Sequence, residues 1–156
     1  MPVGKKLVLD ANLLLLLTIG LMDRSEIVRF KRTNRFTIAD FDALTDIVAN
    51  AQVVITTPHI LTEVSNLANS LREDQKKDFA HSFREVIKNL DERSKQATVL
   101  SEHTLFPFGI TDVAALTEST GALLLTEDGR FASQVNLLGG FALSLNGALA
   151  IRSQEV

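Results

Sequence analysis

The sequence predicts an α/β protein with a three-layer α/β/α architecture, in which helices cover both faces of a central, mostly parallel sheet. Two observations lead to this prediction. Short apolar segments such as Val53–Thr56 alternate along the chain with longer segments of helical periodicity, as expected of parallel strands joined by helices. Most of their residues are apolar in succession rather than alternating with polar residues, which is typical of strands buried on both faces.

Length and composition indicate one globular domain over residues 1–156. Hydrophobic residues make up 46% of the chain and charged residues 22%, a balance that supports a substantial core. The net charge of −3 provides no overall positive field to attract nucleic acid or a membrane, so any nucleic-acid contact needs a local basic patch. The chain has no cysteine, which excludes disulfides and zinc–thiolate sites and fits a reducing, cytoplasmic location.

The first predicted elements are a strand at residues 7–9, which ends at Asp10, and an apolar helix over residues 12–21. The uninterrupted apolar run of this helix is about half the ~18–20 residues that a membrane span needs, so we expect a buried helix and no membrane partner. Thr37 is predicted to be the N-cap of an amphipathic helix that continues to about Asn50.

Strands and helices continue to alternate after residue 50. We expect a strand at Val53–Thr56, and then a helix that begins at Pro58, where a missing N–H has no consequence. Further helices are predicted over residues 73–93, from a Thr111 cap to Gly121, and over residues 129–137. Further strands are predicted at residues 98–100, 122–125 and 141–145.

Four acidic residues fall near the predicted carboxyl edge of the sheet, each in a different segment: Asp10, Glu63, Asp112 and Asp128. Ligands of open α/β sheets bind at this edge, so we expect an acid-lined cleft there. Each acid also has a simpler structural explanation. Asp10 and Asp128 can cap the helices that follow them. Asp112 lies near a helix N-terminus, where the dipole favours an anion, and Glu63 can be solvated on the flank of its helix.

A cluster of four carboxylates indicates a site for hard divalent cations. Unpaired carboxylates repel one another, and Mg²⁺ or Mn²⁺ prefers such oxygen ligands. Two ions of this kind can activate a water molecule and stabilise a leaving oxygen in phosphodiester hydrolysis. Other chemistries find no support. The histidines are not at metal-ligand spacing (His59, His81 and His103), and no glycine-rich phosphate loop follows a strand.

Four segments in this order, LVLDANLLL, TPHILTEVSNL, GITDVAAL and LLLTEDGRF, resemble the motifs of the PIN domain family over about residues 7–145. The resemblance implies a parallel sheet between helices and a metal-dependent ribonuclease acting on single-stranded RNA, as in many toxins of bacterial toxin–antitoxin modules. It implies that the four acids are catalytic and bind Mg²⁺ or Mn²⁺. It also implies supporting roles for Asn12, Asn66 and Thr126.

Two features depart from that family. Arg130 stands where many members carry an acid, which would either weaken a second metal site or supply a contact to RNA phosphate. The segment from Arg24 to Asn50 is long for a compact toxin. The alternative function is a non-catalytic RNA- or protein-binding module on the same fold. An antitoxin partner and a homodimer both remain open.

Residues 24–35 are the most basic part of the chain, and two interpretations of them remain. The basic residues are Arg24, Arg29, Lys31, Arg32 and Arg35. They can hold an RNA backbone while Phe30 and Phe36 stack on a base. Alternatively, the segment is a solvated loop in which arginines pair with Asp40 or Asp42 and the phenylalanines belong to the core.

Overall fold

The structure of the protein, a computed structural model, describes residues 6–154. Within that range a five-stranded sheet has the strand order β3-β2-β1-β4-β5, and its pairings are parallel. The strands are β1 (Lys6–Leu9), β2 (Val53–Thr56), β3 (Asp91–Glu92), β4 (Leu123–Leu125) and β5 (Phe141–Leu143). The α-helices are α1 (Ala11–Met22), α2 (Ile38–Asn50), α3 (Pro58–Ala68), α4 (Glu73–Lys88), α5 (Ala97–Ser101), α6 (Ile110–Glu118), α7 (Gly129–Leu137) and α8 (Leu145–Gln154).

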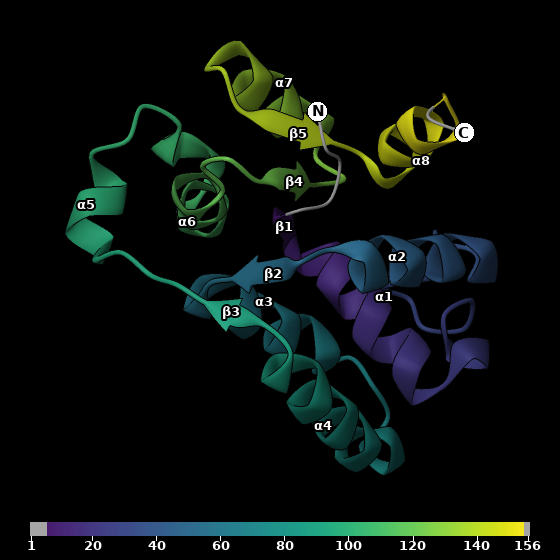
Figure 1. Ribbon diagram of the computed structural model, residues 1–156. Helices are drawn as coiled ribbons and strands as arrows, with labels where there is room; N and C mark the ends of the chain where they lie inside the picture. Colours follow the sequence, from purple (N-terminus) through teal and green to yellow (C-terminus); the bar gives the residue numbers. More distant parts are fainter. Residues whose placement is uncertain (1–5, 155–156) are drawn as a thin grey trace.

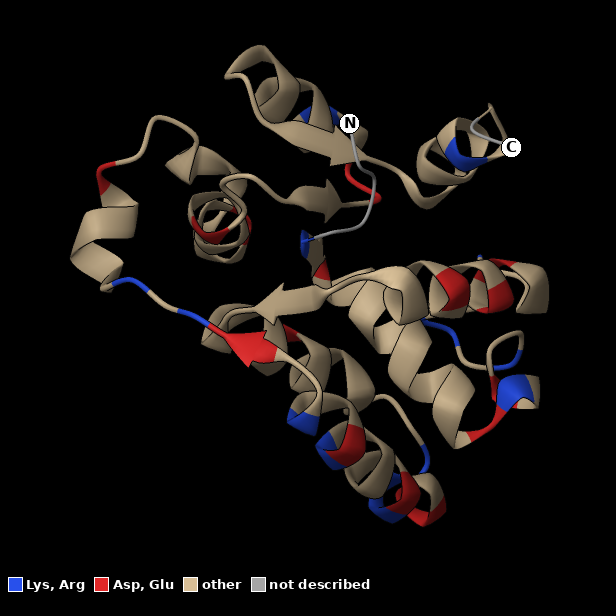
Figure 2. Cartoon of the chain, viewed as in Figure 1, with Lys and Arg blue, Asp and Glu red and all other residues tan. Residues whose placement is uncertain are grey.

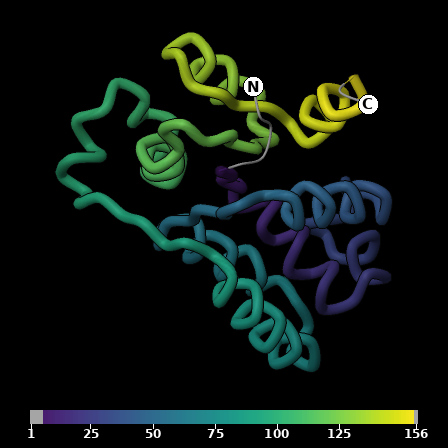
Figure 3. Tube along the Cα trace, in the orientation of Figure 1, coloured from purple at the N-terminus to yellow at the C-terminus, as the bar shows by residue number. Residues whose placement is uncertain are grey.

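Helices cover both faces of this sheet, which confirms the predicted three-layer α/β/α architecture. In Figure 1 the strands extend from β3 at the lower left to β5 at the top, with α6 to their left and α1 and α2 to their right. The connection through α5 carries the chain from edge strand β3 across to α6 (Figure 3). The strand order explains the two layers. Strands run outward from β1 first in one direction and then in the other, and right-handed crossovers place the two sets of helices on opposite faces.

The core is centred on β1 and α1. Leu7, Val8 and Leu9 are at most 2% exposed, because β1 has a strand on each side and helices on both faces. Every residue of α1 from Leu13 to Gly20 is buried, as its uniformly apolar sequence predicts. Within residues 6–154, no helix combines the length and the apolar character that crossing a membrane requires.

The N-terminal half has the predicted elements and caps. The Thr37 hydroxyl accepts a hydrogen bond from the Asp40 N–H (3.0 Å), and the Asp40 carboxylate accepts one from the Thr37 N–H (2.9 Å). This reciprocal pair is a capping box, and α2 ends at Asn50 as expected. Strand β2 and helix α7 also have the predicted bounds, and Pro58 is the first residue of α3.

Three predictions in the C-terminal half are wrong. The helix predicted over residues 73–93 ends at Lys88, because Asp91 and Glu92 pair with β2 as the short edge strand β3. Residues 98–100 belong to α5 rather than to a strand, since β3 already occupies that edge of the sheet. Thr111 does not cap α6. The helix begins at Ile110 after Gly109, and it ends before Gly121 is reached.

The last predicted strand, residues 141–145, is also too long. Strand β5 ends at Leu143, and Leu145 begins α8, a helix that the sequence pattern did not predict. The Leu145 N–H donates a hydrogen bond to the Glu127 carboxylate (3.1 Å), which lies 18 residues earlier in the chain. The first turn of α8 is therefore satisfied by this tertiary contact together with a local N-cap, because the Ser144 hydroxyl accepts a hydrogen bond from the Gly147 N–H (3.0 Å).

Candidate functional site

The four predicted acids lie around one pocket at the carboxyl edge of the sheet. Asp10, Glu63, Asp112 and Asp128 all line this pocket, whose volume is about 150 Å³. They come from the end of β1, from α3, from the first turn of α6 and from the turn before α7. Among residues 6–154, none that lines the pocket is Lys, Arg or His. The pocket therefore has four carboxylates and no balancing positive side chain.

The register of the sheet explains this convergence. Leu9 of β1 lies opposite Leu125 of β4, so the residues that follow them, Asp10 and Thr126, leave the sheet side by side. The Asp10 N–H donates to the Leu125 carbonyl (2.9 Å) and extends the ladder beyond β1. Strand β2 is the other neighbour of β1, and α3 begins shortly after it, which brings Glu63 to the same edge.

Asp10 holds the site together through the backbone. Its Oδ1 accepts a hydrogen bond from the Leu13 N–H (2.9 Å), and its Oδ2 accepts one from the Glu127 N–H (2.8 Å). The first bond caps α1, as the simpler explanation of Asp10 predicted, and the second ties α1 to the turn after β4. Burial raises the pKa of Asp10, while the Leu13 and Glu127 N–H groups oppose that rise.

Asp128 and Asp112 are held less firmly. Asp128 caps α7 by accepting a hydrogen bond from the Phe131 N–H at Oδ1 (3.0 Å), and the residue is exposed. Asp112 lies in the first turn of α6 but does not cap it, since the cap position belongs to Gly109. Its position there supports the helix-dipole explanation, yet its carboxylate also faces the shared pocket.

The acids interact electrostatically. The pKa of Asp112 is raised to about 7, first by burial and then by the negative charges of Asp128, Glu63 and Asp10. A rise of this kind means that the four carboxylates are close enough to oppose one another's ionisation. Removing or neutralising one of the charges would relieve that repulsion, and so would a bound cation.

The residues of the pocket only partly fit a divalent metal ion. Carboxylate oxygens are the ligand type that Mg²⁺ and Mn²⁺ prefer, and the pocket lacks any competing cation. However, among residues 6–154 no group of three or more His, Asp or Glu side chains is arranged to hold one metal ion. The donor chemistry thus fits, while the side chains do not stand in a complete coordination shell.

The predicted supporting residues divide into two groups. Asn12 and Thr126 line the acid pocket, and the Thr126 hydroxyl accepts a hydrogen bond from the Asp128 N–H (3.2 Å). Asn66 is exposed and lines a neighbouring cavity instead. Arg130 is exposed on α7 and is not among the residues that line the acid pocket.

The basic segment, residues 24–35, lies beyond the far end of α1. Helix α1 begins at the acid pocket and has 12 residues, so the segment starts about 18 Å from Asp10. Figure 2 shows basic residues clustered there, away from the sheet. Phe30 and Phe36 are buried, so the prediction that they stack on a base is wrong and the core interpretation holds.

The arginines of this segment are partly engaged within the protein. Arg24 forms an ion pair with Asp42 (Nη1 to Oδ1, 2.9 Å), and its guanidinium lies over the Phe41 ring. Arg35 lies over the Phe36 ring, 4.9 Å from its centre. The remaining basic residues are exposed: Arg29, Lys31 and Arg32. These three are the side chains of the segment that remain suited to a phosphate contact.

Two residues near the site were not found by sequence reasoning. Glu127 uses its N–H to hold Asp10 and its carboxylate to hold the start of α8. His59 lines the cavity next to the acid pocket. No local pattern distinguishes either residue, because Glu127 acts on segments far away in the chain and His59 lies at no metal-ligand spacing.

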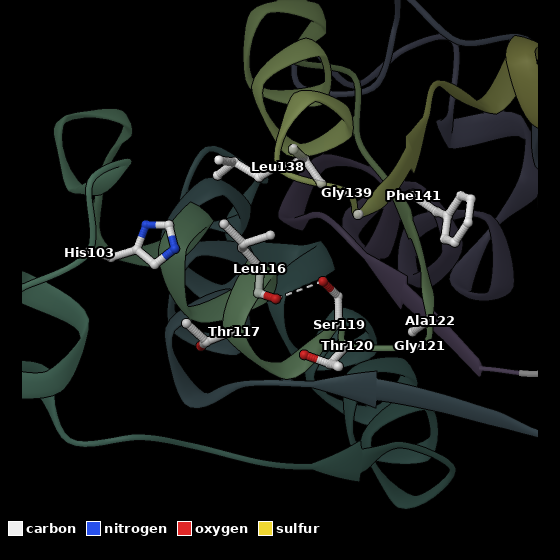
Figure 4. A pocket seen from close by; sticks show the side chains of 12 residues that line it. His103, Leu116, Thr117, Ser119, Thr120, Gly121, Ala122, Leu138, Gly139 and Phe141 are labelled. Atoms are coloured by element: carbon white, nitrogen blue, oxygen red, sulfur yellow. Dashed lines mark hydrogen bonds between the residues drawn. The ribbon is translucent and has the colours of Figure 1, made fainter.

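A separate cavity of about 460 Å³ lies at the opposite edge of the sheet, near the amino ends of β4 and β5 (Figure 4). It is lined by residues that include His103, Ser119 and Phe141, and by no carboxylate. The Ser119 hydroxyl donates to the Leu116 carbonyl (2.7 Å). Since it lacks the acids and faces away from them, this cavity is not part of the candidate site.

Comparison with protein-family models found no match for this chain, and comparison with curated proteins found none either. Among solved structures, the chain is similar to a domain of a functionally unknown protein from Methanocaldococcus jannaschii DSM 2661. The two are 16% identical, the match covers 90% of this chain and 91% of that one, and the TM-score is 0.44. Membership of the PIN domain family therefore stays a prediction.

Proposed function

We propose that the protein is a metal-dependent ribonuclease of the PIN type, which hydrolyses phosphodiester bonds in single-stranded RNA. One observation carries the proposal. Four carboxylates from four separate segments line one small pocket, and no positive side chain of the described part of the chain lines it with them. Such a pocket is unfavourable for a free protein, because the charges oppose one another's ionisation, and it becomes favourable when a divalent cation binds.

The chain's own residues have distinct roles in this proposal. Glu63 and Asp112 would hold Mg²⁺ or Mn²⁺ together with the second oxygen of Asp128. Asp10 would contribute through the lone pairs that its two backbone hydrogen bonds leave free. Because both oxygens of Asp10 are fixed by N–H groups, this carboxylate is preorganised before any ligand arrives. A bound divalent ion would supply Lewis acidity and a lowered pKa for water.

The experiment is a cleavage assay on a 5′-labelled single-stranded RNA pool with Mn²⁺. We expect cleavage by the wild type, its loss in excess EDTA, and a loss of at least about 100-fold in Asp112→Asn, because that variant removes one ligand charge. Asp46→Asn is the matched control, since Asp46 is exposed on α2 and remote from the pocket, and it should cleave normally. Cleavage that persists undiminished in EDTA would contradict the proposal.

A second function is favoured by one observation, the lack of a complete metal-binding group among the described residues. It is a non-catalytic RNA- or protein-binding module on the same fold. This module would bind RNA without cutting it, and its melting temperature would not respond to Mn²⁺. The cleavage assay, repeated alongside a binding measurement on the same RNA, separates the two functions.

A further inference from the structure

A second cavity, of about 460 Å³, adjoins the acid pocket. Glu63 and Thr111 line both, so the two spaces are neighbours along α3 and the start of α6. Its volume lies within the range of small-molecule sites in proteins. Whatever occupies this cavity therefore lies directly beside whatever occupies the acid pocket.

One face of α3 provides most of the lining. His59, Glu63 and Asn66 are four and three residues apart, so they project from the same side of the helix. Pro58 and Ile110 add apolar surface on either side. The cavity thus combines a planar ring, an amide and apolar walls.

The environment of His59 is unusual for a structural histidine. Its Nδ1 atom is buried and has no hydrogen-bond partner among the residues that the structure describes. An unpaired buried polar atom is unfavourable, and an apolar side chain of similar shape would avoid it. The ring is therefore not held by a hydrogen bond at that nitrogen, and it is a planar part of the cavity lining.

The charges around the cavity select the kind of ligand. Glu63 is in the lining, and no Lys or Arg within residues 6–154 is. A phosphate would meet a carboxylate without a compensating cation, so it is disfavoured there. A neutral, planar group with hydrogen-bonding edges fits better, because RNA bases stack on flat side chains and bond to amides along their edges.

Resting on the proposed ribonuclease function, we propose that this cavity is a subsite for one RNA base next to the phosphodiester held at the acids. The His59 ring stacks on the base, and the Asn66 amide bonds to its edge. The Thr62 hydroxyl donates to the Pro58 carbonyl (2.8 Å), which leaves its oxygen free to accept from the same base. The subsite would give the enzyme a preference for certain bases at one position.

The test measures binding of fluorescein-labelled 12-residue oligo(A), oligo(C), oligo(G) and oligo(U) RNA by fluorescence anisotropy, with Ca²⁺ in place of Mn²⁺. We expect His59→Ala to weaken binding of the preferred oligonucleotide at least about fivefold, the low end for loss of one base stack. His59→Phe should bind within about twofold of the wild type, because it keeps a flat ring. His81→Ala is the matched control, since His81 is exposed on α4, and it should change nothing.

Asn66→Ala provides a second measurement that does not depend on the folding of His59→Ala, because Asn66 is exposed. It should reduce the difference in affinity among the four oligonucleotides. The inference is overturned if the wild type binds none of them, if His59→Phe is as weak as a folded His59→Ala, or if Asn66→Ala keeps the full base preference. Mn²⁺-dependent cleavage with no effect at His59 would leave the ribonuclease proposal standing and remove the subsite. Base-selective binding without cleavage would leave the subsite standing and remove the ribonuclease proposal.

Discussion

Asp10 and Asp112 line the same pocket, yet the protein holds their carboxyl groups in opposite ways. Both oxygens of Asp10 accept backbone N–H groups, which join α1 to the turn after β4. Asp112 lies in the first turn of α6 without serving as its cap, and its pKa is raised to about 7 by burial and by three neighbouring carboxylates. Neutral substitutions at these two positions should therefore have opposite effects on the metal-free protein.

We expect Asp112→Asn to stabilise the metal-free protein, and the effect to depend on pH. The folded-state pKa of about 7 lies above the unfolded value, so the folded protein binds more protons between about pH 4 and pH 7. The contribution of the Asp112 carboxyl group to the free energy of unfolding of the wild type is greatest below about pH 4. It falls as the pH rises to 7 and is constant above that pH. Urea unfolding of both proteins should show little difference at pH 4 and a gain of about 1–2 kcal/mol for Asp112→Asn at pH 8, since partial exposure screens the repulsion.

Asp10→Asn should instead destabilise the metal-free protein. An asparagine oxygen can accept only one of the two N–H groups now bound by Asp10, and its amide N–H₂ would face the other donor. Leaving that buried N–H unpaired lowers the free energy of unfolding by about 1–3 kcal/mol, a loss that relief of charge repulsion only partly offsets. The melting temperature in EDTA measures this, and an Asp10→Asn protein that melts above the wild type would contradict it.

At the scale of elements, the contact between α1 and α2 depends on Gly20. A Cβ atom at this position would overlap the ring of Phe41, which is 4% exposed. We expect Gly20→Ala to lower the free energy of unfolding by about 1–3 kcal/mol, because a closely packed core tolerates added atoms poorly. Gly129→Ala is the matched control. Nothing lies within 4 Å of its added Cβ, and alanine favours the helix, so it should be neutral or stabilised by up to about 1 kcal/mol.

The basic segment, residues 24–35, leads to a prediction about RNA binding. Arg29, Lys31 and Arg32 are exposed, whereas Arg24 is already paired with Asp42. Changing the three exposed residues to Ala should weaken RNA binding and reduce the log–log salt slope by about 0.7 for each lost phosphate contact. Arg24→Ala should change the slope less, because its charge is already neutralised. Equal slopes in the wild type and the triple variant would mean that the segment is a solvated surface.

At the scale of the whole molecule, the site exists because four segments end at one edge of the sheet. A ligand that binds across them is expected to stabilise the entire fold. In the presence of Mn²⁺ at a hundred times its Kd, the free energy of unfolding should rise by about 2.7 kcal/mol, or about 5–10 °C in melting temperature. Asp112→Asn should gain much less. A wild type that shows no shift at millimolar Mn²⁺ would favour the binding-module function.

Local patterns in the sequence were enough to predict the architecture and the meeting of the acids. Runs such as residues 53–55 have no alternation of apolar and polar residues, which is typical of a strand covered on both faces. Once the strands are parallel, their carboxyl ends share an edge, so the residues that follow β1 and β4 lie at the same edge, and the structure shows that these two strands are neighbours. Asp10 and Asp128 could be placed at one site for this reason, without any knowledge of distances.

Only the tertiary structure decided the features that depend on partners far apart in the chain. Asp91 and Glu92 are a strand because β2 is beside them, and the Leu145 N–H at the start of α8 donates to Glu127, which lies 18 residues earlier in the chain. The same holds for the burial that raises the pKa of Asp112, and for the position of His59 beside the acid pocket. Sequence periodicity reports which side of an element is apolar. It does not indicate which other element packs against that side, and this packing determines both the pKa shifts and the cavities.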